Sequence, residues 1–398
     1  MSSVARPFRV LLLGVAFALA LAPPAAADDI DVVADGLDNP RGLAFGPGGD
    51  LYVSESGRGG SECFPNDPND PDAGNTCFGT SGAVTRVDLD DGGQERIADG
   101  LPSLATPEGA EALGPTDVSF RSKWSPRGFL TIGLGGDPAL RDDLPAAGAG
   151  MAWLYRLHPG GALDPVADLG AFEAAEDPDA EQSGDEHNTN PNSVAAASRG
   201  RAVVADAGGN DVLVVTRDGE ISVLGVLPFL EAPAPDIPDF PVPPGTPIPT
   251  QPVPTSVALG NDGAVYVGQL VGFPFPAGAA NVWRIEPGSD PEVYLSGFTL
   301  VVDLAFGKDG SLYVLQIASD SFLAGPTPGA LIRVRPDGKR EELAAGRLTA
   351  PTGVALRGGN AYVSNHGTEP GTGEVVRIRL PQYEDDDDHE DYGDDHDD

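Results

Sequence analysis

Basic residues are scarce in this sequence, which has 24 Lys and Arg against 61 Asp and Glu and a formal net charge of -37. A chain with so large an excess of negative charge repels a polyanion instead of steering it in. Nucleic acid is therefore excluded as a partner. The same excess favours ligands that are cationic or that bind through a metal ion.

Cysteine and histidine are also scarce, with two and five residues respectively. The sequence offers neither a CxxC pair nor a nearby histidine to complete the four ligands of a structural zinc site. Cys63 and Cys77 lie fourteen positions apart in one polar segment. We expect them to form a disulfide in an oxidising compartment, where it would order that segment.

Long apolar runs are absent except for Val10–Ala22, which follows Arg6 and Arg9 and precedes the small residues 25–27. This pattern predicts a signal peptide over residues 1–27, because a membrane span needs about 20 apolar residues. No second apolar segment follows. We expect a secreted protein, extracellular or periplasmic if the host has an outer membrane, and without a membrane span.

Familiar catalytic motifs are missing too: the sequence contains no nucleophile elbow, HExxH, P-loop or dinucleotide fingerprint. The five histidines are scattered or fall in the C-terminal tail. An enzyme is not thereby excluded, because a propeller enzyme assembles its site from several blades. The tail, residues 384–398, carries eleven carboxylates and is predicted to be disordered. It would either bind cations weakly or keep the protein well solvated.

What the sequence does contain is one block repeated six times. Each block begins with a short, mostly proline-led strand, passes through a tight glycine turn into a second β-rich strand, and continues into a third strand with a recurring arginine. The first strands are Pro40–Phe45, Pro115–Phe120, Pro191–Val194, Pro254–Leu259, Val302–Phe306 and Pro351–Leu356. The arginines are Arg86, Arg156, Arg284, Arg333 and Arg377, with Val214 in the third block.

An outermost strand follows each of the first five blocks, whereas the sixth block ends at Leu380 without one. Ile30–Leu37 resembles the missing strand and is expected to complete the last blade from the other end of the chain. The predicted fold is therefore an all-β, six-bladed β-propeller closed by an N-terminal outer strand. It forms one domain over residues 28–383.

Several phrases of the sequence resemble NHL repeats, which form six-bladed propellers: residues 39–45, 51–55 and 204–210. Over essentially the whole mature chain, the arrangement is similar to the ScyD/ScyE family of exported propeller proteins. That resemblance implies the fold and export. It implies no established catalytic activity.

Two groups of enzymes share part of the same pattern. Pro191–Ser193 and Ala205–Ala207 are similar to two ligand segments of the SMP-30-like lactonases, which bind a metal at the central mouth through carboxylate and Asn side chains. Soluble quinoprotein sugar dehydrogenases also open with a strand like Gly42–Phe45 and a glycine turn. The match is partial, since the remaining ligands and a catalytic histidine have no evident counterparts here.

Nearly all long insertions are expected on one face of the propeller, where binding usually resides. One insertion, residues 173–190, is strongly acidic, and another, residues 231–254, contains ten prolines and is predicted to be extended. The insertions are residues 56–82, 102–114, 135–150, 173–190, 231–252, 271–280, 318–329 and 367–373. These insertions either form a binding surface or have accumulated on an exported scaffold without a binding role.

Polar residues recur on this face at the ends of second strands and at the starts of first strands. Converging oxygens around a central mouth favour a hard cation such as Ca²⁺, but Asp and Asn at such corners also cap backbone amides. The candidate ligand-binding residues are Arg41, Glu55, Asp117, Asn192, Asp206, Gln269, Asp303, Gln316 and Asn365. Glu55, Asn192, Asp206 and Asn365 are the candidate metal ligands, for Ca²⁺ or another divalent cation.

The sequence thus predicts a monomeric extracellular binding or scaffold protein that recognises a protein or small-molecule ligand through its long-loop face. The alternative is a metal-dependent hydrolase of the lactonase type with its site at the central mouth. Fold alone does not decide between them.

Overall fold

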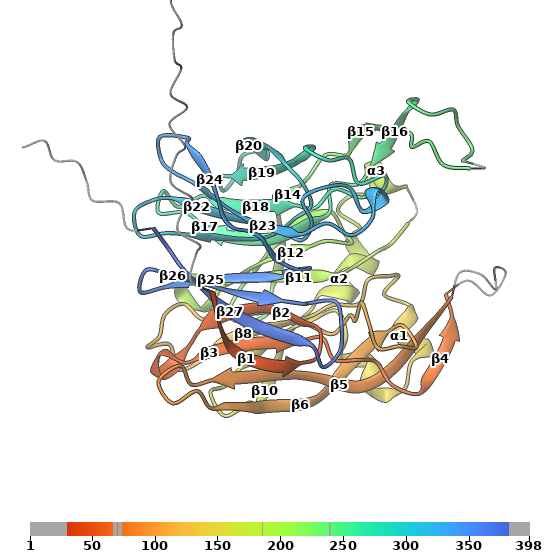
Figure 1. The fold of residues 1–398 in the computed structure, drawn as a ribbon. Coiled ribbons are helices and arrows are strands. Elements are labelled where there is room, and N and C mark those ends of the chain that lie inside the picture. Colours follow the sequence, from red (N-terminus) through yellow and green to blue (C-terminus); the bar gives the residue numbers. More distant parts are fainter. Residues whose placement is uncertain (1–29, 67–69, 71–73, 185, 239, 382–398) are drawn as a thin grey trace, which may run out of the picture.

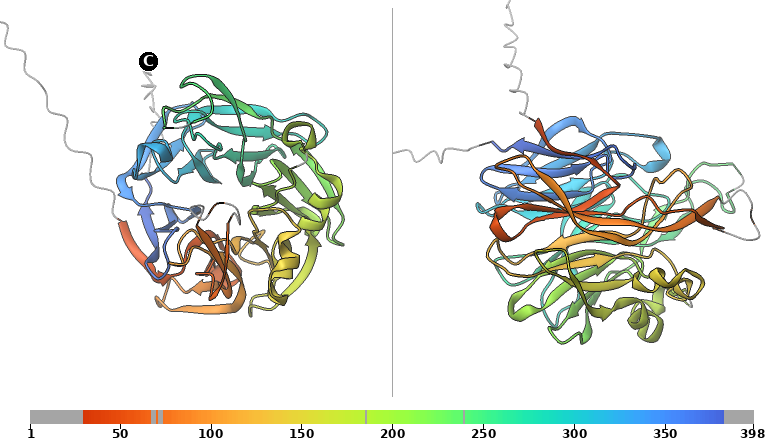
Figure 2. Two further views of the ribbon diagram at one scale, coloured as in Figure 1. Left: turned by 90° about the vertical axis from the view of Figure 1, so that its right-hand side faces the viewer. Right: turned by 90° about the horizontal axis from the view of Figure 1, so that it is seen from below.

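The computed structural model describes residues 30–66, 70, 74–184, 186–238 and 240–381. Within these residues, six antiparallel sheets are arranged as blades around one axis, which confirms the predicted propeller (Figure 2). The expected signal peptide and acidic tail lie outside the described residues, so both stay predictions.

Each blade has four principal strands that run in order from the axis to the rim. Blade one contains β2 (Pro40–Phe45), β3 (Leu51–Glu55), β5 (Asn75–Val87) and β6 (Gln94–Ala105). Blade two contains β7 (Pro115–Ser119), β8 (Gly128–Ile132), β9 (Trp153–Leu157) and β10 (Leu163–Asp168). Blade three contains β11 (Pro191–Ala196), β12 (Ala202–Asp206), β13 (Asp211–Val215) and β14 (Ile221–Val226).

The other three blades repeat this arrangement. Blade four contains β17 (Pro254–Leu259), β18 (Val265–Gln269), β19 (Ala280–Ile285) and β20 (Glu292–Phe298). Blade five contains β21 (Val301–Phe306), β22 (Leu312–Gln316), β23 (Gly329–Val334) and β24 (Arg340–Leu348). Blade six contains β25 (Gly353–Arg357), β26 (Asn360–Asn365), β27 (Gly373–Arg379) and, at its rim, β1 (Ile30–Leu37).

The ring closes where β1 pairs antiparallel with β27, Ile30 facing Ile378 and Leu37 facing Gly373. The N-terminal strand therefore supplies the rim of the last blade, as predicted. An ion pair of 2.6 Å between Arg377 and Asp31 spans the same seam. Closure leaves β27 no unpaired edge.

The hydrophobic core lies between blades, because each sheet buries both faces against its neighbours. In the described chain, six clusters of buried side chains each span two adjacent blades, including the pair formed by blades six and one. Aromatic rings on second strands contact rings at the ends of the next blade's first strand. These pairs are Tyr52 with Phe120, Tyr266 with Phe306, and Tyr362 with Phe45, at centroid separations of 4.7–5.1 Å.

The repeated arginine of the third strand neutralises acidic neighbours in its own blade. Arg333 pairs with Asp309 of the turn before β22 at 2.6 Å. Arg284 pairs with Asp262 of the corresponding turn at 2.8 Å and with Glu292 of the outer strand at 3.0 Å. The arginine column thus ties the turn of the inner hairpin to the rim of the blade.

The long insertions gather on one face of the ring, on the right-hand side of Figure 1. They contain the short elements β4 (Glu62–Pro65), α1 (Leu140–Asp143), α2 (Leu169–Glu176), α3 (Ala180–Ser183), β15 (Leu230–Pro233) and β16 (Pro247–Thr250). We call this side the long-loop face. None of the helices in the described residues is both long and apolar enough to cross a membrane.

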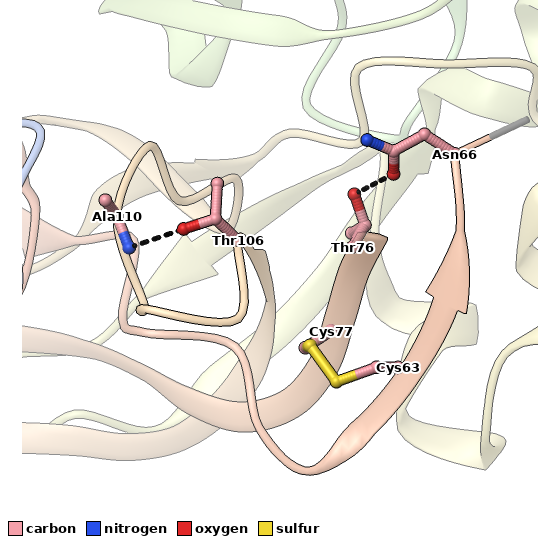
Figure 3. Close-up of a disulfide and its surroundings, with 6 residues drawn as sticks. All are labelled: Cys63, Asn66, Thr76, Cys77, Thr106 and Ala110. Atoms are coloured by element: carbon pink, nitrogen blue, oxygen red, sulfur yellow. Dashed lines mark hydrogen bonds between the residues drawn. A yellow bond between two sulfur atoms is a disulfide. The ribbon is translucent and has the colours of Figure 1, made fainter. Parts of the chain in front are cut away.

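Two insertions are more regular than the sequence suggested. The segment after β3 forms a hairpin in which β4 pairs with an extended β5, and Cys63 faces Cys77 across it in the predicted disulfide (Figure 3). At the hairpin's outer end, the Thr76 hydroxyl donates to Asn66 Oδ1 at 2.6 Å (Figure 3). The proline-rich insertion likewise folds into a hairpin, β15 with β16, because prolines are tolerated on edge strands.

Candidate functional site

A cavity of about 130 Å³ opens at the centre of the long-loop face, where all six first strands begin. It is lined by one residue at the start of each repeated block, that is, Arg41, Thr116, Asn192, Thr255, Val302 and Thr352. Four of the residues that follow these positions also line it, namely Gly42, Asp117, Ser193 and Asp303. We call this space the axial cavity.

Local backbone irregularity contributes to the orientation of these side chains. In five blades the first strand carries one extra residue opposite its partner, as between Pro115 and Asp117, which face Ile132 and Thr131. The same shift occurs between Pro191 and Ser193, and in blades one, four and five. A β-bulge redirects the inserted side chain, here at the end of the strand that borders the axis.

The hydroxyls of the cavity hold neighbouring blades together. Thr116 Oγ1 donates to the Pro191 carbonyl at 2.6 Å, and Thr352 Oγ1 donates to the Pro40 carbonyl at 2.6 Å. Thr255 Oγ1 donates to the Val301 carbonyl at 2.7 Å in the same way. Each bond runs from one blade to the next. The hydroxyl hydrogens are consequently committed, and only acceptor lone pairs remain for a ligand.

Asp117 lies on blade two and caps the first strand of blade three. Its Oδ2 accepts from the Ser193 hydroxyl at 2.9 Å and from the Val194 amide at 2.8 Å, while Oδ1 accepts from the Val118 amide at 2.8 Å. Gly42 is required beside it, because a Cβ there would lie 1.9 Å from Asp117 Oδ1.

Asp303 repeats this geometry on blade five, the blade opposite blade two in a ring of six. Its Oδ2 accepts from the Val354 amide of blade six at 2.7 Å, and Oδ1 accepts from the Leu304 amide at 2.8 Å. The axial cavity thus has a carboxyl group on each of two opposing walls. We call Asp117 and Asp303 the axial carboxyl pair.

Burial dominates the electrostatics of this pair. Loss of hydration raises the pKa of Asp117 to about 7, although three hydrogen bonds to the carboxylate work in the other direction. For Asp303, burial comes first, and repulsion by Asp117 adds to it, so that its pKa lies well above the ordinary value. The two groups therefore titrate as a coupled unit that resists carrying two negative charges.

Arg41 also borders the cavity, but its head group is engaged with the loop before β7. Its Nη2 donates to the Ala112 carbonyl at 2.7 Å, and Nε donates to the Ser56 hydroxyl at 3.3 Å. Burial lowers the pKa of Arg41 to about 10, partly offset by the charge of Glu111. The guanidinium thus connects the loop before β7 to blade one.

Glu55 lies outside the axial cavity, in a buried ionic network of blade one. Its carboxylate accepts two hydrogen bonds from Arg96, at 2.6 and 3.1 Å, and one from the Asp38 amide at 2.7 Å. Arg96 also bonds Asp38 at 2.9 Å, and Arg58 bonds it at 2.6 Å. Both carboxylates are almost fully buried, and both have charged partners.

Asp206 and Asn365 likewise cap the backbone of their own blades. Asp206 accepts from the amides of Asn190, Gly208 and Gly209 at 2.6–3.1 Å. Asn365 Oδ1 accepts from the Thr349 amide at 2.7 Å. Among the four predicted metal ligands, only Asn192 lines the axial cavity, and its amide donates to the Thr255 carbonyl at 2.6 Å.

The two predicted glutamines serve similar structural contacts. Gln269 Oε1 accepts from the Trp283 indole at 2.8 Å, and Gln316 Oε1 accepts from the Thr299 amide at 2.9 Å. Of the nine candidate binding residues, the axial cavity brings together Arg41, Asp117, Asn192 and Asp303.

A second polar group lies off the axis, in the insertion between blades two and three, and none of its members is among the nine predicted binding residues. Glu173, Asp177 and His187 each place one ligand atom within 4.8 Å of the others and could hold a metal ion. The acidic run in residues 173–187 was the only signal for it, because nothing in the sequence shows which of its carboxylates are buried.

No protein-family model matches the sequence, and no curated protein matches it. Among solved structures, a protein of unknown function from Bacteroides thetaiotaomicron aligns over 89% of this chain and 76% of its own, with 10% identity and a TM-score of 0.54. A glucose dehydrogenase aligns over 89% and 100%, with 15% identity and a TM-score of 0.49.

Virginiamycin B lyase from Staphylococcus aureus aligns over 89% of this chain and 100% of its own, with 13% identity and a TM-score of 0.45. At these identities a likeness in structure concerns the fold alone. The likeness to the Bacteroides protein therefore concerns the propeller fold, and the residues of the chain's own cavity carry the functional argument.

Proposed function

We propose that this protein is an exported binding protein whose axial cavity takes a small, positively charged amine. The observation that carries the proposal is the axial carboxyl pair, two half-buried acids on opposite walls of one small cavity. Buried carboxylates need a compensating charge or hydrogen-bond donors. An ammonium group between the walls would supply both.

The threonine hydroxyls of the lining support the same ligand class. Because Thr116, Thr255 and Thr352 donate their hydroxyl hydrogens to backbone carbonyls, they present acceptors to the cavity. A ligand that donates hydrogen bonds is therefore favoured over one that accepts them. The net charge of -37 would further raise the local concentration of cations near the protein.

Size restricts the ligand further. The cavity, of about 130 Å³, is small, so the amine has only a few heavy atoms or inserts one end. The surrounding loops would contact any portion outside the cavity.

Calorimetric titration with ethanolamine, with the neutral isostere ethylene glycol and with acetate tests the proposal. We expect ethanolamine to bind, with an affinity that increases as the pH rises through about 7, where the carboxyl pair ionises. Asp117→Asn and Asp303→Asn should each weaken binding, while Asp337→Asn in a turn on the opposite face should not. Equal binding of glycol and amine would contradict the charge-based proposal.

The alternative function is hydrolysis, and one observation favours it. A carboxyl group with a pKa of about 7 has the value that suits a general acid or base at neutral pH, and Asp117 combines this with access to a cavity. Turnover of a panel of lactones and esters, with and without divalent metals, distinguishes the two functions. Activity lost in a folded Asp117→Asn variant would favour the hydrolase.

Export and release belong to the same proposal and rest on the N-terminal sequence pattern. We expect the mature chain to begin at Asp28 and to be monomeric. N-terminal sequencing of protein recovered from the growth medium, followed by light scattering, tests both points. Retention of residues 1–27 on the exported protein would overturn the signal-peptide assignment.

A further inference from the structure

A second site lies on the long-loop face of blade three, where the C-terminal end of α2 approaches the turn between β12 and β13. Glu173 and Asp177 are four residues apart at this helix end, and His187 returns to them after α3. One ligand atom from each of the three lies within 4.8 Å of the others. His187 Nδ1 is 3.4 Å from Asp177 Oδ2.

Several polar atoms in this group are buried without a hydrogen-bond partner. They include Asp177 Oδ1, His187 Nδ1, Asn188 Oδ1 and Asp211 Oδ1. Such atoms are rare in folded proteins, and each is costly unless another partner is present. Four of them in one neighbourhood indicate that a shared partner belongs there.

Asp211 is the independent observation that points to a ligand. Its side chain is 1% exposed, and it faces Asp206 across the β12–β13 ladder. Repulsion by Asp206, Glu173 and Asp179 adds to burial in raising its pKa, so its carboxyl group shares their surroundings. The unpartnered Oδ1 thus belongs to a carboxyl group in the same acidic neighbourhood.

The four most buried acids of this neighbourhood have no Lys or Arg partner in the described chain. Glu173, Asp179, Asp206 and Asp211 are 1–3% exposed, and none of the ion pairs among the described residues joins them to Lys or Arg. No basic residue lies in the last turn of α2 either, although that end of a helix carries partial negative charge.

The turn between β12 and β13 fits closely around these donors. A Cβ on Gly208 would lie 2.6 Å from Asn188 Oδ1, so only glycine leaves this oxygen its place. Asp206 holds the same turn through the Gly208 and Gly209 amides. The Asn188 oxygen is therefore held close to this turn by the shape of the backbone.

We propose that Glu173, Asp177 and His187 bind a divalent transition metal such as Zn²⁺ or Mn²⁺, with Asp211 and Asn188 as adjacent oxygen donors. One imidazole nitrogen combined with carboxylate oxygens suits these ions better than Ca²⁺, which prefers an all-oxygen shell. The site is off the axis and shares no residue with the axial cavity, so it stands or fails independently of the amine proposal.

Binding would have a structural consequence. The ion would join the end of α2 and the segment after α3 to the β12–β13 turn, and would neutralise the buried acids. We therefore expect metal to stabilise the protein.

The test uses full-length protein without a histidine tag, stripped with chelator and titrated with Zn²⁺, Mn²⁺, Ca²⁺ and Mg²⁺ by calorimetry and thermal unfolding. We expect one tight site that prefers Zn²⁺ and Mn²⁺. Glu173→Gln should weaken the affinity for Zn²⁺ by at least about 10- to 100-fold, the loss that follows when a hydrogen-bond partner of a zinc ligand is removed. Glu176→Gln, exposed on the same helix, is the matched control.

Metal-free stability separates loss of the site from loss of the fold. Glu173→Gln and Asp211→Asn remove repulsion, so each should raise the melting temperature without metal and abolish the increase that Zn²⁺ produces in the natural protein. His187→Asn replaces the imidazole nitrogen by an amide oxygen. The preference of the site among metal ions should therefore shift towards Ca²⁺. Zn²⁺ binding unchanged in Glu173→Gln and His187→Asn, or tighter binding of Ca²⁺ by the natural protein, would overturn the proposal.

Discussion

The axial carboxyl pair combines a structural and a functional demand at the scale of single residues. Each carboxyl group caps the first strand of the following blade, which favours the ionised form, yet burial favours the protonated form. For Asp117 the effect of burial is larger. The cavity is therefore expected to change charge near neutral pH, within reach of a ligand.

This titration predicts how stability depends on pH. Asp117 ionises near 3.8 in the unfolded chain and near 7 in the folded protein, so between these values the folded state holds the extra proton. The free energy of unfolding should fall as the pH rises through this range, by up to about 1.4 kcal/mol per pH unit. Urea unfolding of the natural protein and Asp117→Asn at several pH values measures the difference. Parallel pH profiles would contradict it.

The buried network of Glu55 gives a second prediction. The Arg96→Ala substitution leaves Glu55 without its cationic partner. It also removes one of the two arginines that pair with Asp38, which keeps its ion pair with Arg58. Because Arg96 is itself partly exposed, we expect a loss of about 2–3 kcal/mol, at or below the usual range for breaking a buried pair.

The matched control for this network is Arg86→Ala, which breaks an exposed pair with Glu95 and should cost less than about 1 kcal/mol. Denaturant unfolding compares the two variants. Equal losses would show that burial of Glu55 does not set the cost.

Sequence reasoning located the ring of the axial cavity because its members occupy one position in a repeated block. It could not distinguish a residue that lines the cavity from one that only caps backbone amides. Asp206 and Asp117 both follow the pattern of a polar residue at a strand end, but only Asp117 lines the cavity. The direction of a side chain at a bulge depends on register, which is fixed by tertiary pairing. Asp211 was missed because its burial arises from contacts between distant segments.

At the scale of elements, the insertions show where the sequence is least informative. The boundaries of the repeated strands follow from proline, glycine turns and alternation, and Pro40–Phe45, Pro254–Leu259 and Arg340–Leu348 agree with the structure. Residues 56–82 and 231–252 read as polar or proline-rich loops, yet both contain hairpins. Their strand pairing depends on backbone contacts between neighbouring segments, which composition does not reveal.

The disulfide hairpin yields a prediction at this scale. Replacing Cys63 and Cys77 together by serine should destabilise the β4–β5 hairpin by about 3 kcal/mol, since the bridge closes a short loop of the unfolded chain. Hydrogen exchange should increase in β4 and at the start of β5, with little change in β2 and β3. Uniform loss of protection through blade one would show that the hairpin is part of the cooperative core.

At the scale of the whole molecule, closure by β1 makes the two ends of the chain interdependent. A variant lacking residues 30–37 removes the buried Ala34 and Leu37 and exposes the edge of β27. We expect a loss of about 5 kcal/mol or more and association through the open edge. Urea unfolding and light scattering measure both effects.

A peptide of residues 30–37 added in trans is the control for this deletion. It should restore the monomer and part of the lost stability, whereas a scrambled peptide should not. Failure of the matching peptide would show that covalent connection, and not edge pairing, supplies the stability.

The pairing of β1 with β27 also sets an order of events during biosynthesis. Among the described strands, β1 is made first and its partner β27 is made last, and a contact of such long sequence separation forms slowly. Until then the nascent protein cannot lock into its final form. A chain that stays open in this way remains extended until β27 has been made, which is compatible with the export proposed above.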